Sequence, residues 1–471
     1  MTSTIKVNTV TTESGSTLTI GGCGKTVALA SGATQTGFGR NGAVDWQTTV
    51  KTADFTASSG EGYFVDTTSG EVDVALPAGS AGAIVAVADY ANTADTNNII
   101  LKPNGSDKIE GSTDDVRINV EGGAGTLVFV DSTKGWIVTD TGNSDDISEN
   151  FITATGGTVT TVCSNFKVHT FTGPGTFQVT STSNTPTNNQ VDYLVVAGGA
   201  SGGTGNSGSA AGGGAGGLRF SAGTWCAPSP VAPRAGSMAP VTLTSYPITV
   251  GAGASGQSSN GLKGNCGSAS SFSTFPAAGG GGGGGHCATD GKSGGSGGGG
   301  ATGSPTGVTC GGAGNTPPVS PSQGNPGGAS GPHAPNYIKG GGGGAGAAGV
   351  AGNPPTKSGC GGAGLQVNIN GANHYWAGGG ASSAWQCSSA GAGDGGIGGG
   401  GGGTIPSSGP ASPGTGGGSA LNSGGTGVKG GATGAGGTNT GGGGASQNAN
   451  NSPATSGAGG SGIVIIRYRF Q

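Results

Sequence analysis

Residues 279–285 of this 471-residue chain read GGGGGGG, seven glycines in succession. Glycine has no Cβ atom, so backbones that consist of it can approach one another closely on every side. In the polyproline II conformation seven residues span about 22 Å and make no hydrogen bonds within the segment. The N–H and C=O groups then point outward to parallel or antiparallel neighbours. The run therefore predicts one rod of a polyglycine II bundle.

The rest of the glycine lies in the same part of the chain. Of 113 glycines, 24 fall in residues 1–190 and 89 in residues 191–471, and net charge changes from −10 to +6 at the same place. A helix-rich globular enzyme is excluded, because each interior glycine costs a helix about 1 kcal/mol relative to alanine. Segments poorer in glycine, which we expect to be loops, separate the other long runs, at 297–300, 340–344, 398–403 and 441–444.

Apolar strands are predicted on both sides of the glycine tract. Residues 192–197 (DYLVVA) precede it and residues 463–470 (IVIIRYRF) follow it. The turn sequence TGPG at 172–175 predicts a hairpin, and a weaker strand is expected at 246–250. We expect strands 192–197 and 463–470 to pair into a small sheet. This sheet would hold the two ends of the glycine tract, residues 198–462, together.

The sequence before the tract divides into three parts. We expect residues 1–45 to form short strands that attach the protein to a larger assembly or knit a trimer, or else to form a loose arm. Residues 46–141 hold seven short strands, which predicts a compact, β-sandwich-like module, and residues 142–150 form a polar linker to a last domain, 151–471. The expected fold is mainly β: an elongated fibre with N-terminal β segments, a small β module and a C-terminal polyglycine II bundle framed by strands.

The sequence offers no arrangement typical of catalysis, of a cofactor or of a metal. A phosphate loop ending at Lys292 would need glycine at the position of His286. None of the four histidines has zinc-ligand spacing to a cysteine. Only three acidic residues lie beyond residue 190, so we expect no enzyme. The eight cysteines allow 105 pairings, of which Cys287–Cys310 and Cys360–Cys387 would staple loops.

Four segments, taken in order, resemble the glycine-rich domain of tail-fibre and receptor-binding proteins of marine bacteriophages, cyanophages among them. The segments are 192–199 (DYLVVAGG), 246–253 (YPITVGAG), 271–274 (SFST) and 459–468 (GGSGIVIIRY). Residues 22–30 and 315–325 are also similar to that family. The resemblance implies a homotrimeric virion fibre, joined to other tail proteins by its N-terminus. Loops at the rod ends would bind a host surface receptor, a glycan or an outer-membrane protein.

The remaining sequence features agree with a virion protein. The first residues lack a signal-peptide pattern, and the chain has no run of about 18 apolar residues that would insert into a membrane. The basic second half is too weakly charged to predict nucleic-acid binding. We therefore expect a virion component that reaches the extracellular medium after lysis.

Three loops combine aromatic, histidine and amide side chains, which suit the rings and hydroxyl groups of sugars. We therefore expect receptor contacts there, or else aromatic residues that cap the rods or pack between subunits. The candidate contact residues are His286, His333, Tyr337, Asn373, His374, Tyr375, Trp376 and Trp385.

Two other functions stay open. One is a purely structural virion or extracellular fibre without receptor binding. The other is an ice-binding polyglycine bundle, which would need a more regular Gly-X-X period than these runs have.

Overall fold

A computed structural model describes residues 44–140 and 151–470, with short gaps. The predicted linker and all but the last two residues of the predicted N-terminal segment lie outside the described residues. The chain divides into two compact units, Met1–Ser148 and Glu149–Gln471. The gaps are residues 184, 206–208, 225–231, 287–288, 303–307, 332–336, 338, 353–355, 386–390, 409, 420 and 448–454.

The described part of the first unit consists of two sheets. One sheet has the order β1-β3-β5-β8-β9 and the other β2-β4-β6-β7. The strands are β1 (Asp45–Lys51), β2 (Phe55–Thr56), β3 (Glu61–Val65), β4 (Val72–Ala75), β5 (Ile84–Asp89), β6 (Ile99–Lys102), β7 (Val116–Ile118), β8 (Ala124–Asp131) and β9 (Gly135–Val138).

The chain winds between these two sheets instead of forming hairpins only. Strands β1, β3 and β5 pair in parallel in one sheet, and β2, β4 and β6 pair in parallel in the other. The last strands, β7 to β9, pair in an antiparallel manner. Alternate side chains point into one shared core, which includes Val74, Leu101 and Trp136.

The second unit begins and ends in strands. It contains β10 (Thr153–Thr155), β11 (Thr158–Val162), β12 (Phe166–Phe171), β13 (Gly175–Ser181), β14 (Gln190–Val196), β15 (Leu218–Phe220), β16 (Ala239–Pro240), β17 (Ser245–Thr249), β18 (Ser270–Phe272), β19 (Phe275–Ala277), β20 (Leu365–Val367), β21 (His374–Trp376) and β22 (Ile463–Arg469). Among the described residues, short 3-10 helices lie at Pro186–Asn188 and Ala232–Arg234. No helix among the described residues has the length and hydropathy that crossing a membrane requires.

The sheets of this unit hold the ends of the glycine tract together. Strand β22 lies between β12 and β14 and pairs with both in an antiparallel manner, so the predicted pairing across the tract is confirmed. A second sheet has the order β10-β13-β17-β18-β19. One aromatic core, with Phe177 and Tyr468 among its members, joins strands of both sheets. We call these two sheets the framing sheets.

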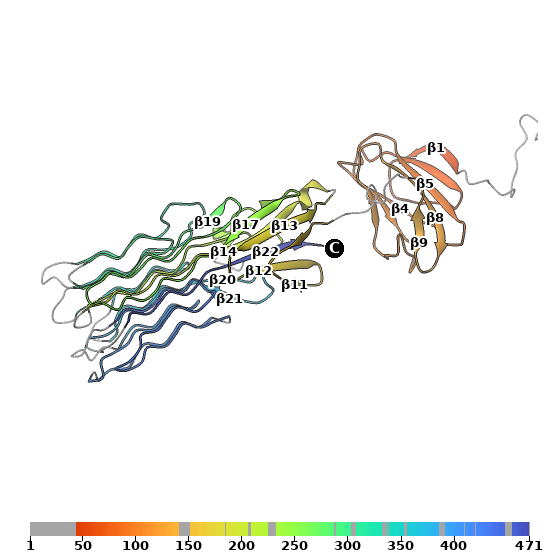
Figure 1. Cartoon of the computed structure of the whole chain (residues 1–471). Coiled ribbons are helices and arrows are strands. Elements are labelled where there is room, and N and C mark those ends of the chain that lie inside the picture. The colour runs from red at the N-terminus through yellow and green to blue at the C-terminus, as the bar shows by residue number, and fades with distance from the viewer. Residues whose placement is uncertain are drawn as a thin grey trace, which may run out of the picture. The chain divides into compact units, whose positions relative to one another are not determined.

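Beyond the framing sheets the glycine-rich segments lie side by side along the unit, as Figure 1 shows. The segment 211–217 forms hydrogen bonds with six others, and its donors change partner with a period of three residues. The donor bonds are Gly212 N to Gly340 O, Gly213 N to Gly444 O, Gly214 N to Gly281 O, Ala215 N to Gly343 O, Gly216 N to Gly441 O and Gly217 N to Ala278 O. The carbonyl groups accept from three more segments, around residues 197–203, 296–299 and 380.

Burial follows the same period. Several segments are buried along their whole length: 191–205, 209–218, 280–285, 294–302, 339–345, 376–384, 398–406 and 440–447. In segments at the surface every third residue is buried, as at Gly414 and Gly417 or at Gly434, Gly437 and Thr440. A repeat of three residues shows that successive peptide groups point in three different directions.

Candidate functional site

The candidate contact residues separate into two groups, which lie at opposite ends of the packed glycine-rich segments. Asn373, His374, Tyr375 and Trp376 lie beside the framing sheets, at what we call the sheet end. His286, Tyr337 and Trp385 lie at the other end of the buried segments, which we call the loop end. The nine steps from Trp376 to Trp385 correspond to about 30 Å of extended backbone. His333 lies outside the described residues.

At the sheet end the aromatic residues belong to a hairpin. Strands β20 and β21 pair in an antiparallel manner, with Leu365 opposite Trp376. Trp376 is fully buried in a core with strands β14 and β22, and its indole N–H donates to the carbonyl oxygen of Val367 at 3.1 Å. This side chain therefore presents no surface to a ligand in this fold. Burial also lowers the pKa of the half-buried His374.

At the loop end two aromatic rings from different segments lie together. The ring centroids of Tyr337 and Trp385 are 4.2 Å apart, with an angle of 36° between the ring planes. Both side chains are half-buried. The indole nitrogen of Trp385 is buried and has no hydrogen-bond partner. We call these two residues the ring pair.

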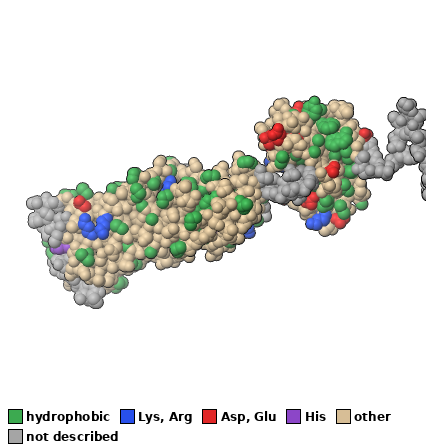
Figure 2. Space-filling model, turned by 45° about the horizontal axis from the view of Figure 1, so that its top comes forward, with side chains coloured by type: hydrophobic (Ala, Val, Ile, Leu, Met, Phe, Trp, Pro, Cys, Tyr) green, Lys and Arg blue, Asp and Glu red, His purple; other side chains and the backbone are tan. Residues whose placement is uncertain are grey.

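His286 also lies at the loop end. Its Nδ1 atom lies 2.5 Å from the hydroxyl oxygen of the buried Ser209, and its backbone N–H donates to Thr204 O at 3.1 Å. These contacts fix the ring beside the ends of two buried segments. Figure 2 shows histidine and cationic side chains near this end of the unit, whereas uncharged residues cover most of its visible flank.

Lys339 is a residue of this end that the sequence analysis did not single out. Its side chain is fully buried, and the ammonium group donates to the carbonyl oxygen of Ser383 at 2.5 Å. Burial lowers the pKa of this amine from 10.5 to about 7. The available signal was its place two residues after Tyr337, as the first cation before a run of five glycines.

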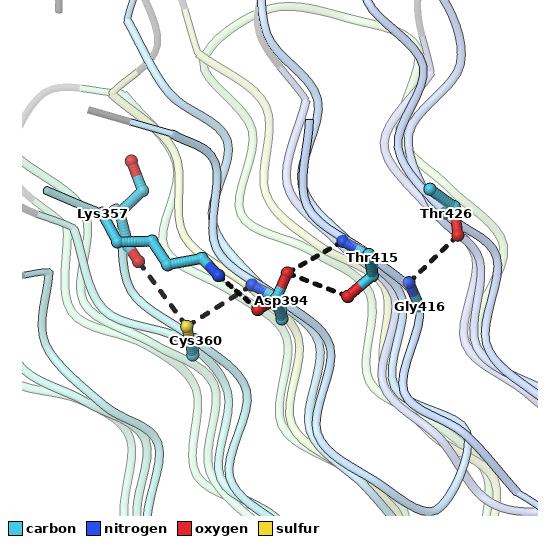
Figure 3. A network of polar contacts seen from close by, with 7 residues as sticks. Lys357, Cys360, Asp394, Thr415, Gly416 and Thr426 are labelled. Carbon is cyan, nitrogen blue, oxygen red and sulfur yellow. Dashed lines mark hydrogen bonds and ion pairs between the residues drawn. The ribbon is translucent and has the colours of Figure 1, made fainter. Parts of the chain in front are cut away.

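A polar network crosses neighbouring segments on the flank (Figure 3). Lys357 forms an ion pair with Asp394, whose other carboxylate oxygen accepts from Thr415 N at 2.9 Å and from its hydroxyl group at 3.0 Å. The hydroxyl oxygen of Thr426 accepts from Gly416 N at 3.2 Å. These bonds tie the segments to one another, and both charged groups are largely satisfied within the chain.

Among the described residues, no group of three His, Cys, Asp or Glu side chains could hold a metal ion. Cys310 and Cys360 carry free thiols. The cysteines considered as their partners, Cys287 and Cys387, lie outside the described residues.

A family model described as a glycine-rich domain matches residues 172–437, more than half of the chain. The chain belongs to this glycine-rich domain family. The matched region includes the described residues of the loop end and the buried segments that lead to them. No match is found among curated proteins. The family description concerns a type of domain, so the function of this glycine-rich domain has to be argued from its geometry.

Proposed function

We propose that the protein is a bacteriophage tail fibre or adhesin that attaches the virion to a receptor on the host-cell surface. The loop end of the glycine-rich domain would make the contact, and a bacterial surface glycan is the receptor class that suits it best. The observation that carries this proposal is the ring pair. Two half-buried aromatic rings beside each other can offer their exposed faces to a sugar ring for stacking.

The packed segments give such a contact a rigid support. We infer that they are polyglycine II helices, because both their hydrogen-bond partners and their burial repeat every three residues, and this helix has three residues per turn. Peptide groups that point in three directions can bind neighbours all around each rod. Residues at the loop end are then held by several rods at once, which limits the entropy lost on binding.

Binding of the full-length protein to cells tests the proposed attachment. We expect the fluorescently labelled chain to adsorb to some members of a panel of marine cyanobacteria and other marine bacteria. Alanine at both Tyr337 and Trp385 should reduce adsorption at least tenfold, because buried aromatic anchors carry much of the energy of an interface. Tyr375→Ala, which removes one half-buried aromatic ring at the sheet end, is the control and should leave adsorption unchanged.

Two results would contradict this function. One is that the unaltered chain binds no cell of the panel and does not compete with phages that infect those cells. The other is that the double variant adsorbs as well as the Tyr375 control. Purified lipopolysaccharide and capsular polysaccharide from cells that bind the chain would then separate a glycan receptor from an outer-membrane protein.

A further inference from the structure

Lys339 joins the two chain segments that carry the ring pair. It follows Tyr337 by two residues, and its acceptor, Ser383, precedes Trp385 by two residues. The two rings and the ammonium–carbonyl bond therefore bridge the same pair of segments at adjacent positions. We propose that Lys339 is a positioning residue, which sets the distance and angle between the rings of Tyr337 and Trp385. The value of that position for binding rests on the proposed function.

The acceptor of this bond is itself held firmly. The backbone N–H of Ser383 donates to the hydroxyl oxygen of Ser446 at 2.9 Å, and its own hydroxyl group donates to Ser446 O. The Ser383 hydroxyl oxygen also accepts from Thr404 N at 3.1 Å. On the other side, Lys339 O accepts from Gly352 N at 3.1 Å. The side chain of Lys339 thus connects two backbone positions that are each held by other hydrogen bonds.

An uncharged side chain could fill the space of Lys339 equally well. It is fully buried, and none of the described residues forms an ion pair with it. A methionine would fill the same space without the cost of desolvating an amine. What lysine adds is a donor that reaches a backbone carbonyl group of the neighbouring segment. We therefore assign its role to the bond with Ser383 and not to the volume that it fills.

Burial without a counter-charge makes this bond depend on pH. Desolvation alone lowers the pKa of Lys339, to about 7. The described titratable groups toward this end include Tyr337, His286, Asp290, Lys357 and Asp394, and no described residue forms an ion pair with the ammonium group of Lys339. An exposed lysine has a pKa near 10.5, so opening of this end binds a proton between about pH 10.5 and 7. Opening therefore becomes easier as the pH falls through that window and levels off below it.

Fluorine NMR of the full-length protein labelled with 5-fluorotryptophan tests the assignment without any receptor. Trp385→Phe identifies the Trp385 resonance. We expect this resonance to titrate with a midpoint near pH 7 in the unaltered protein, because the charge of Lys339 appears beside it. In Lys339→Met, which keeps the aliphatic stem, the resonance should shift at all pH values and lose that titration. In His286→Gln the titration should remain.

Two outcomes would overturn the proposal. The first is an unchanged Trp385 resonance with an unchanged titration in Lys339→Met. The second is loss of the titration in His286→Gln, a variant that keeps Lys339. This result would assign the titration to the histidine, and it can be obtained even if Lys339→Met does not fold. Because no receptor is present, failure of cell adsorption would count against the proposed function and leave this result standing.

Discussion

Alanine at Gly342 is the substitution that tests the packing of the glycine segments most directly. Gly342 donates to Gly380 O at 2.8 Å and accepts from Gly362 N at 2.9 Å. A Cβ atom at this position would lie 1.9 Å from the carbonyl oxygen of Gly213. Three neighbouring segments therefore meet one residue that has no room for a methyl group.

The size of the effect follows from the distance. Ordinary contact begins at 3.4 Å, so a separation of 1.9 Å requires the segments to move apart by about 1.5 Å. That movement breaks both hydrogen bonds of Gly342, and each buried peptide group left without a partner costs about 1–3 kcal/mol. The lower entropy of the unfolded alanine chain offsets about 0.4–1 kcal/mol. We expect the free energy of unfolding to fall by about 2–5 kcal/mol.

Gly418→Ala is the matched control, because nothing lies within 4 Å of a Cβ atom built at that position. It should leave the stability unchanged or raise it slightly. Guanidinium unfolding of the full chain measures the difference, and hydrogen exchange of residues 197–217 shows whether neighbouring segments open. If Gly342→Ala unfolds with the same midpoint and exchanges as slowly as the control, the close-packed arrangement of glycine segments is refuted.

The remaining predictions concern acid stability and assembly. Nδ1 of the buried His169 lies 2.7 Å from Gly156 O and Nε2 lies 3.1 Å from the Tyr468 hydroxyl group, so the neutral ring donates from Nδ1 and accepts at Nε2. Burial lowers the pKa of His169, so the unfolded chain binds the proton first and stability should fall as the pH drops below about 6.5. His169→Gln should flatten this slope in guanidinium titrations at pH 5–7, and an unchanged slope would contradict the assignment. Light scattering should give three times the 43.8 kDa of one chain, and a monomer mass would exclude the homotrimer inferred from the resemblance.

Some strands of the framing sheets, β12, β13, β14, β17 and β22, could be predicted because they are encoded locally. Residues 463–466 are a continuous apolar run, as expected for a strand buried on both faces. Strand β22 lies in the middle of its sheet, and six of its seven residues are buried. The TGPG turn does separate β12 from β13, but the predicted hairpin is wrong: the two strands lie in different framing sheets and do not pair with each other. Local composition thus locates such strands and turns but not their pairing partners.

Other parts depend on contacts that no short segment encodes. The seven predicted strands of the first unit fit hairpins as well as the observed winding, because a period of two residues does not distinguish parallel from antiparallel partners. The sequence places Trp376 in a candidate contact loop because that loop combines aromatic, histidine and amide side chains. Its partner strand, Leu365–Val367, has buried residues at both ends and an intermediate one between, a short alternation that identifies the hairpin only once pairing is known.

The packing of the rods also restricts where function can reside in this fold. In the segments that are buried along their whole length, most positions face neighbouring backbone and hold glycine, alanine, serine or threonine. Larger side chains that could recognise a partner therefore lie at the ends of these segments or at exposed positions of the segments at the surface. Lys339 is the limiting case: it is the last residue before the run 340–344, and its long side chain lies along a neighbouring segment to reach Ser383 O. A substitution that changes the side chain of a loop-end residue thus leaves the glycine packing intact, whereas a substitution one residue further inward, at Gly340, disrupts it.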